Sequence, residues 1–528
     1  MPQRTLFYNG RIVTLDPRNP RPDALAVVDG RVAFAGDRER CRSVLGPGVE
    51  EVDLQGAWTL PSFTDSHIHF SNYAAGLNNV AMDNTASMQE ALELVRQRVQ
   101  KVRPGEWVVG GNWDLNRWAE QRPPDRHALD AVSPENPVAL HSRDGHSLWV
   151  NSRALQLAGI NADSPDPDGG QIVREPGSSE PSGWLLETAR GIVYAVVDAP
   201  EEPLTESIRK AFPHALATGI TSIHDFDRME AIQAYRELHA AGELRLRVLK
   251  TIPVENLDWA LDEGIRTYQG DEWFRFGQVK IFTDGALGSH SAAMLEPYNG
   301  EPENTGIEVT PPDELRELVL RAARGGLACA LHAIGDKANR NALDAFRHVR
   351  NEGVGDALRH RIEHVQHIHP DDLPRLAQLG VIASVQPIHQ TSDMFVADRL
   401  LGPERARSSY AWRSLLDTGA RLAFGSDCPV EPFNPFLGLH AAVTRQRDGK
   451  PEGGWQPQER LSAEEAYRAF TEGAAWTSGE EGIKGRLSAG MLADFVQLSD
   501  NPLECAPDNI KDVQVLATYV GGQEAYRA

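Results

Sequence analysis

The middle of the chain alternates short apolar segments with amphipathic segments of helical period, and this alternation constrains the fold more than any other sequence feature. DELRELVLRAARGG and ANRNALDAFRHVRNEG are typical of helices. The segments that we expect to form strands are ITSIHDF, RLRVLKTI, FGQVKIFTDG, LACALHAIGD, RHRIEHVQ, VIASVQP and RLAFGSDCP. Repeated strand–helix units predict an α/β fold with a parallel sheet, either closed into a barrel or doubly wound. No GxGxxG motif follows the first strand, which disfavours a dinucleotide-binding sheet.

The two ends of the chain differ from this middle because they show strand and turn signals with little helical period. Near the N-terminus, LFYNGRIVTL and ALAVVDGRVAFAG contain Asn-Gly and Asp-Gly pairs, which are typical of tight hairpin turns. Near the C-terminus, GRLSAGMLADFVQLSD and VQVLATYVGG repeat the pattern. We therefore expect one composite β-sandwich built from residues 1–58 and 479–528.

The region between these ends, residues 59–478, contains the repeated strand–helix units. A long segment, residues 71 to about 210, interrupts the repeat with stretches rich in Trp, Pro and Gly, such as GNWDLNRW and SPDPDGGQIVREPGSSEPSGW. We expect this segment to be an insertion after the first strand of the sheet, placed where it could cover a site.

Charge and cysteine content exclude several classes of protein. The 528 residues include 53 Lys and Arg against 75 Asp and Glu, a net charge of −22 that disfavours binding to nucleic acid or to anionic lipid. Four scattered cysteines form no CxxC motif, as expected for a reducing cytoplasm: Cys41, Cys329, Cys428 and Cys505. No signal-peptide core and no run of about 18 apolar residues occurs, so we expect neither export nor a membrane span.

Residues able to bind a metal follow several of the expected strands. His67 and His69 end LPSFTDSHIHF, and positions i and i+2 of a strand face the same side, so both imidazoles could bind one cation. Alone, such a pair could equally be solvated at a loop edge. His332, His364 and Asp427 end later strands, and the carboxyl ends of barrel strands meet at one mouth. This recurrence predicts a metal site.

Lys280 ends FGQVK among apolar residues, where a charged amine pays a desolvation cost. One interpretation is a buried lysine paired with a carboxylate such as Asp284. The other is an amine that has added carbon dioxide to become a carbamate, an anionic oxygen ligand able to bridge two metal ions.

These residues stand in segments that resemble the amidohydrolase superfamily, and within it the branch of YtcJ-like and N-substituted formamide deformylase-like proteins. The matching segments are PSFTDSHIHF, GNWDLNRW, SRDGHSLWVNSRAL, GQVKIFTDGALGSHSA, LHAIGDKANRNALDAF, RIEHVQHI, SVQPIHQTSDM, FGSDCPVEPFNP and KGRLSAGMLADFVQLSD. The resemblance covers nearly the whole chain. It implies a TIM-like (β/α)8 metal-dependent hydrolase barrel with a composite β-sandwich.

The resemblance also implies a ligand set: His67, His69, Lys280 as a carbamate, His332, His364 and Asp427. One or two ions are expected, most favourably zinc, with iron or manganese able to use the same donors. A metal in an open site lowers the pKa of bound water from 15.7 to about 7. Asp427 is then the expected catalytic residue, first as general base and then as the acid that protonates the leaving amine.

Five further residues are candidate substrate contacts. The resemblance places His146 of DGHSLWVNS in the substrate pocket, although a surface histidine would fit this loop as well. Trp113 and Asp114 could line the pocket from the insertion, or Trp113 could be a core residue. Gln386 and His389 follow the seventh strand and are candidate oxyanion or substrate contacts.

These features predict an enzyme that hydrolyses the C–N bond of a small-molecule amide, with an N-substituted formamide as the first choice. Five tryptophans of the insertion favour an apolar or aryl amine group: Trp107, Trp113, Trp118, Trp149 and Trp184. A deaminase or cyclic amidase would use the same site. A metal-free binding or assembly protein on the same fold is disfavoured because all six ligand positions are filled. The sequence leaves the oligomeric state open and allows a homo-oligomer.

Overall fold

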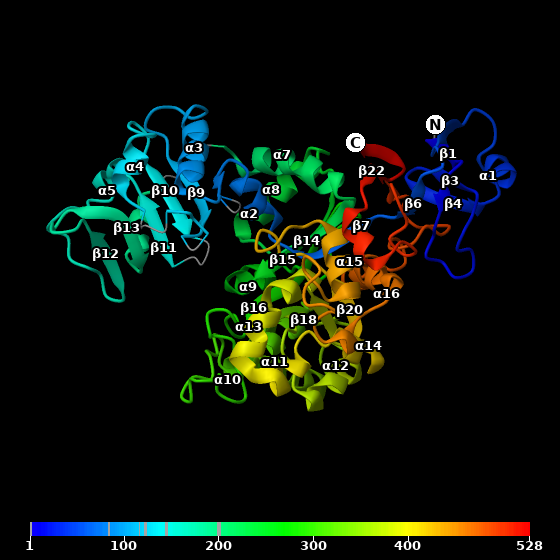
Figure 1. Cartoon of the computed structure of the whole chain (residues 1–528). Coiled ribbons are helices and arrows are strands. Elements are labelled where there is room, and N and C mark those ends of the chain that lie inside the picture. Colours follow the sequence, from blue (N-terminus) through cyan, green and yellow to red (C-terminus); the bar gives the residue numbers. More distant parts are fainter. Residues whose placement is uncertain (1–2, 83–84, 116, 121–123, 143–145, 198–201) are drawn as a thin grey trace. The chain divides into compact units, whose positions relative to one another are not determined.

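The computed structural model describes residues 3–82, 85–115, 117–120, 124–142, 146–197 and 202–528. The chain forms two compact units, one of Met1–Ala74 with Leu204–Ala528 and one of Ala75–Pro203 (Figure 1). Among the described residues, no helix combines the length and the hydrophobicity of a membrane span. The four cysteines are free thiols.

The larger unit contains an eight-stranded parallel sheet that has the strand order of a barrel. Its strands, in chain and sheet order, are β7 (Phe63–Ile68), β14 (Ile220–Asp225), β15 (Arg247–Pro253), β16 (Phe274–Phe282), β17 (Cys329–Ala333), β18 (Arg361–His364), β19 (Ile382–Val385) and β20 (Arg421–Phe424). The predicted (β/α)8 barrel is therefore confirmed, and each expected strand segment overlaps one of these strands. The edge strands β7 and β20 contact each other, so the sheet is nearly closed.

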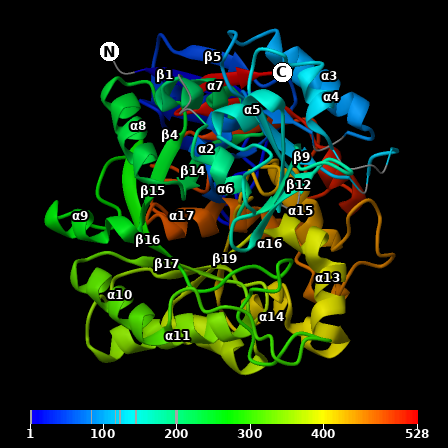
Figure 2. The ribbon, with the colours of Figure 1, turned by 90° about the vertical axis from the view of Figure 1, so that its left-hand side faces the viewer.

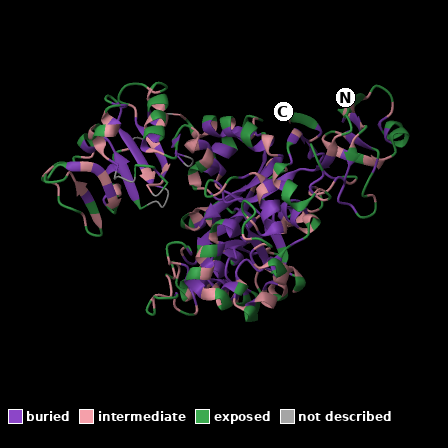
Figure 3. Cartoon of the chain, viewed as in Figure 1, coloured by how far each residue is buried: buried purple, intermediate pink, exposed green. Residues whose placement is uncertain are grey.

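Helices follow the strands and cover the outside of the sheet. They are α7 (Leu204–Ala217), α8 (Met229–Ala240), α9 (Leu257–Asp262), α10 (Pro312–Arg324), α11 (Asp336–Asn351), α12 (Leu373–Leu379), α13 (Pro387–Arg405), α14 (Trp412–Asp417), α15 (Pro435–Thr444), α16 (Ala463–Arg468) and α17 (Ala474–Thr477). Helix α8 lies beside β15 and β16 (Figure 2). Barrel strands are buried over most of their length, whereas the helices expose their outer faces (Figure 3).

The terminal parts of the chain form two further sheets, the first from N-terminal strands alone and the second from strands of both ends. One has the order β4 (Arg31–Gly36), β3 (Ala24–Val28), β1 (Arg4–Tyr8), β5 (Glu50–Asp53), and helix α1 (Arg38–Leu45) packs on it. The other has the order β2 (Arg11–Ile12), β6 (Trp58–Pro61), β21 (Phe495–Leu498), β22 (Val515–Val520), β23 (Gln523–Arg527). Phe7 contacts Phe495 and Tyr519 edge-on at ring-centroid distances of 5.0 and 5.5 Å, so both ends contribute to one core.

The smaller unit lies within the segment predicted to be an insertion, after the first barrel strand. Its sheet has the order β12 (Gly170–Arg174), β13 (Pro181–Glu187), β11 (Ser147–Val150), β10 (Val138–Ser142), β9 (Val108–Trp113), β8 (Val80–Ala81). Its helices are α3 (Met88–Val99), α4 (Arg126–Asp130), α5 (Ser152–Leu157) and α6 (Arg190–Tyr194), and α2 (Phe70–Gly76) leads into it. Trp113, Trp118 and Trp149 pack together in its core.

Candidate metal centre

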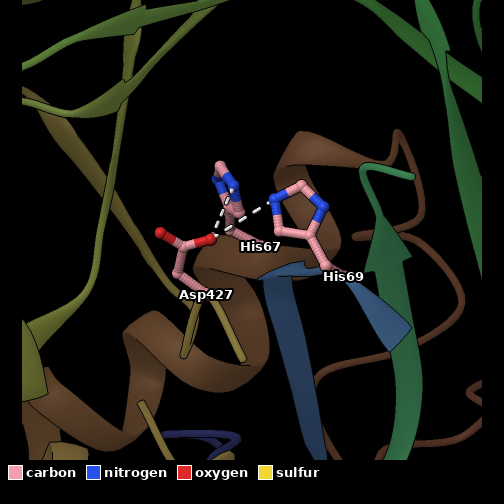
Figure 4. A group of neighbouring side chains, drawn as sticks. All are labelled: His67, His69 and Asp427. Carbon is pink, nitrogen blue, oxygen red and sulfur yellow. Dashed lines mark ion pairs between the residues drawn. The ribbon is translucent and has the colours of Figure 1, made fainter. Parts of the chain in front are cut away.

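Three predicted ligands converge where the barrel sheet closes. His67 lies near the end of β7, His69 follows that strand, and Asp427 follows β20. The Nε2 atoms of His67 and His69 lie 3.4 and 3.5 Å from Oδ1 of Asp427 (Figure 4). Ligand atoms about 2.0–2.2 Å from a zinc ion, arranged tetrahedrally, are separated by about that much. These three side chains can hold one cation.

Both histidines of this group are oriented by carboxylates through their other ring nitrogen. His67 Nδ1 donates to Glu363 at 2.7 Å, and His69 Nδ1 donates to Asp227 at 2.9 Å. Each bond places the proton on Nδ1 and turns the Nε2 lone pair toward Asp427. Burial lowers the pKa of His67 well below its usual value, which keeps the ring neutral as a ligand must be.

The carboxylate Glu363 is itself held by a buried arginine. Arg361, two residues earlier on β18, contacts Glu363 Oε1 through Nε at 2.5 Å, and both side chains are fully buried. Glu363 and Asp227 are not among the candidate site residues predicted from the sequence. For Glu363 a signal exists: two charged residues at i and i+2 of one apolar strand must face the same side, here the barrel interior.

His332 and His364 form the second side of the site. Their ring centroids are 4.5 Å apart, and the His364 ring lies 5.0 Å from that of His67. His364 Nδ1 donates to Gln386 Oε1 at 2.8 Å, which leaves its Nε2 free. His332 Nε2 donates to the carbonyl of Gly285 at 3.0 Å, so in this ring Nδ1 is the nitrogen without a hydrogen bond. Burial lowers the pKa of His332 to about 3.

Lys280 lies near the end of β16 and is buried beside two aromatic rings. Its Nζ lies 4.9 Å from the ring centroid of Phe226 and 4.7 Å from that of Phe282, and no described residue pairs or hydrogen-bonds with it. Burial lowers the pKa of Lys280 to about 8. Asp284 is not its counter-ion, because that carboxylate accepts the backbone N–H groups of Ala293, Ile334 and Gly335.

Backbone contacts between β7 and β20 fix the position of Asp427. Its N–H donates to the carbonyl of His67 at 2.7 Å. The buried carboxylate of Asp65 accepts the backbone N–H and the hydroxyl of Ser426 at 3.0 and 2.6 Å, and also the N–H of His67 at 3.2 Å. Asp65 therefore joins the strand that carries His67 to the loop that carries Asp427.

The two candidates after the seventh strand have different positions. Gln386 is occupied with His364, as described above, so its side chain orients a ligand. His389, in the first turn of α13, places Nε2 3.8 Å from Asp427 Oδ2. His364, His389 and Asp427 form a second group of neighbouring ligand-type atoms.

Three candidate substrate contacts belong to the smaller unit and stay predictions. His146 is exposed and its Nδ1 lies 3.1 Å from both carboxylate oxygens of Glu187. Trp113 is buried, and its Nε1 donates to the carbonyl of Leu140 at 2.8 Å. Asp114 is half-buried. Because three of the five tryptophans pack against one another in a core, they do not support the argument for an aryl-binding surface.

The chain is similar to known proteins over nearly its whole length. The amidohydrolase family model matches residues 50–526. The chain belongs to the amidohydrolase family. It is 36% identical to the protein LONG AFTER FAR-RED 3 of Arabidopsis thaliana, over 99% of this chain and 91% of that protein. It is 31% identical to the putative amidohydrolase YtcJ of Bacillus subtilis (99% of both chains) and 30% identical to the N-substituted formamide deformylase of Arthrobacter pascens (99% and 98%).

A solved structure has the same fold as this amidohydrolase. A metal-dependent hydrolase of Pyrococcus furiosus superposes with a TM-score of 0.79 at 30% identity, over 95% of this chain and 100% of that one. The predicted branch of the family is thus confirmed, and the chain is a hydrolase of carbon–nitrogen bonds. Its donor set fits a divalent cation: imidazoles that each keep one ring nitrogen without a hydrogen bond, and a carboxylate between two of them.

Proposed function

We propose that this amidohydrolase cleaves the C–N bond of a small neutral amide, and that N-substituted formamides are its first substrate class. The observation that carries the proposal is the placement of Asp427 Oδ1 between the Nε2 atoms of His67 and His69. The relative from Arthrobacter pascens, named for deformylation of N-substituted formamides, supports the substrate class. The half-exposed ring of Phe282, 5.0 Å from that of His332, offers an apolar surface beside the ligands.

The proposed reaction needs little beyond these residues. A divalent cation held by them supplies two effects, because it lowers the pKa of a bound water to about 7 and polarises a carbonyl. Asp427 takes a proton from the attacking water while the water oxygen bonds to the carbonyl carbon. The π electrons of the carbonyl group move to the carbonyl oxygen in the same step. Asp427 then gives this proton to the amide nitrogen as the C–N bond breaks, so that a neutral amine leaves.

We propose zinc as the resident ion, one or two per chain, with iron or manganese as chemically acceptable substitutes. Four imidazoles with carboxylate oxygens suit zinc, and the same donors accept the other two metals. Elemental analysis of active protein should find at least one transition-metal ion per chain. His67→Ala should lose that ion together with activity, whereas His239→Ala, a change at a surface ion pair with Asp271, should lose neither.

The substrate test compares several amides on one metal-loaded preparation. N-benzylformamide-like compounds should be hydrolysed at least tenfold more efficiently than hydantoins, dihydropyrimidines, acyl amino acids or aminoheterocycles. Product analysis separates reaction types, because an amide releases an amine and an aminoheterocycle releases ammonia. A tenfold preference for a cyclic or anionic substrate would contradict the formamide proposal and leave the metal mechanism standing.

We also propose that Lys280 is carbamylated. Its unpaired amine attacks carbon dioxide, an N–C bond forms, one C=O electron pair moves to oxygen, and the nitrogen releases a proton to solvent. The supporting observation is a buried amine that lies against the rings of Phe226 and Phe282 and has no hydrogen bond to a described residue. Bicarbonate should accelerate reconstitution of the metal-free protein, and Lys280→Ala should lose activity with partial rescue by short carboxylic acids. Wild-type activity in Lys280→Ala would contradict the proposal, and Lys337→Ala, at a surface pair with Glu308, is the control.

A further inference from the structure

His389 faces the metal centre without a partner of its own. The side chain is 7% exposed, and its Nε2 is buried and has no hydrogen bond to any described residue. The nearest charged atom is Asp427 Oδ2 at 3.8 Å, on the side of the carboxylate opposite to the oxygen that faces His67 and His69. A buried ring nitrogen without a hydrogen bond lowers the stability of the fold unless a bound molecule supplies a hydrogen-bond partner.

The other ring nitrogen of His389 determines which hydrogen-bonding group faces the site. Nδ1 lies 3.4 Å from the side-chain nitrogen of Gln366, which is also buried. An amide nitrogen can only donate, so Nδ1 must accept and the single proton of the neutral ring must be on Nε2. His389 therefore presents an N–H donor toward Asp427 Oδ2.

This arrangement favours a hydrogen-bond donor over a metal ligand. A protonated Nε2 has no lone pair for a cation. The separation of 3.8 Å is also wider than the 3.4 and 3.5 Å of the group with His67 and His69. A carbonyl oxygen about 2.8 Å from His389 Nε2 would accept its N–H at an ordinary hydrogen-bond length.

We propose that His389 is a catalytic residue that donates Nε2–H to the carbonyl oxygen of the amide, and that Gln366 is a positioning residue that fixes its tautomer. This inference rests on the proposed amide hydrolysis. As water oxygen bonds to the carbonyl carbon, the π electrons move to the carbonyl oxygen, where the N–H of His389 stabilises the charge. Asp427 takes up the water proton in the same step, so its carboxyl group becomes neutral as the charge develops on the carbonyl oxygen. The N–H stays on His389 throughout.

The first experiment reverses the tautomer. Gln366→Glu replaces the donor with a carboxylate of the same size, which can only accept and so draws the proton to Nδ1. We expect kcat to fall about 100- to 1000-fold with little change in KM, because the bond is made in the transition state. The kcat of His389→Leu should fall by as much, and both variants should keep the metal content of the wild type. Gln390→Glu is the control, since this buried glutamine contacts Met394 instead.

The second experiment reads the tautomer without turnover. In metal-loaded protein with 15N-labelled histidine, the His389 signals, assigned by their loss in His389→Leu, should show a protonated Nε2 and an unprotonated Nδ1. The Gln366→Glu variant should show the reverse. A proton on Nδ1 in the wild type would overturn the inference.

Two further outcomes would also overturn the proposed role of His389. If His389→Leu binds one ion fewer than the wild type, the side chain is a ligand. If kcat for a formamide changes less than threefold in His389→Leu, the side chain does not contact the transition state. A wild-type protein that hydrolyses no amide would instead contradict the proposed function, and the tautomer measurement separates that failure from a wrong assignment of His389.

Discussion

Three residues of the metal centre have backbone angles that residues with a side chain seldom adopt. The φ angles are 77° at His364, 43° at Val365 and 59° at Asp427. Such a conformation costs on the order of 1–3 kcal/mol per residue and persists where the surroundings enforce it. The hydrogen bonds from His364 to Gln386 and from Asp427 to His67 provide that enforcement. Ligand direction is therefore set by the fold before a cation binds.

Removing the carboxylate behind His69 should weaken metal binding. In Asp227→Ala the ring of His69 loses the acceptor that fixes its proton on Nδ1, so we expect metal affinity to fall about 10- to 100-fold. Competition with a chelator measures this change. Asp271→Ala is a matched control, because that carboxylate also accepts one histidine N–H, from His239, and two other hydrogen bonds. Equal affinities in the two variants would contradict the role of Asp227.

A histidine away from the ligands should make the fold sensitive to acid. Burial lowers the pKa of His360 to about 4, while its Nδ1 accepts the N–H of Cys329 at 3.1 Å. The unfolded chain takes up a proton near pH 6.5 and the folded chain does not, so stability is present above pH 6.5 and is lost as the pH falls toward 4. Between pH 7 and 5 the loss should be about 2 kcal/mol.

The test of this pH dependence compares the wild type with His360→Phe by urea unfolding at both pH values. The variant loses the acceptor for Cys329 at every pH, but it should lose less additional stability on acidification. Parallel pH dependences in the two proteins would show that His360 does not titrate as described.

At the level of elements, apolar runs bounded by turns predict the barrel strands, and the ends of these strands predict the candidate ligands His67, His69, His332, His364 and Asp427. The side chains that orient these ligands are harder to predict, because each pairing is between residues distant in sequence. His67 meets Glu363 only after the sheet closes, and His389 meets Gln366 across two strand ends. For Trp113 the sequence leaves two interpretations open, because composition cannot distinguish a core tryptophan from a pocket tryptophan.

The closure between β7 and β20 depends on a residue without a side chain. A Cβ added at Gly425 would lie 2.5 Å from the backbone nitrogen of His67 and 3.0 Å from Asp65 Oδ1. Gly425→Ala should therefore push the two strand ends apart, lower stability by about 1–3 kcal/mol and weaken metal binding. Chelator competition and thermal unfolding measure both effects. Gly482→Ala, where an added Cβ meets nothing within 4 Å, should change neither. Unchanged metal affinity in Gly425→Ala would show that the closure does not position the ligands.

At the level of the whole molecule, the smaller unit has two hydrophobic clusters of its own residues. We expect a chain of residues 75–203 to fold by itself, because its sheet, helices and buried tryptophans are all contributed from within it. Cooperative thermal unfolding, followed by tryptophan fluorescence, would test this. A Trp113→Ala variant should lower the midpoint, and a gradual, non-cooperative transition in the parent segment would contradict independent folding.

The sheet shared by the two ends of the chain has a consequence for synthesis on the ribosome. Strand β6 is made early, but its partner β21 begins only at residue 495. At the rates of translation known for cells, roughly 20 to 90 seconds separate the two strands. During this time the edge of β6 and the apolar face around Phe7 have no partner strand, which makes the nascent N-terminal segment a target for chaperones and a starting point for aggregation.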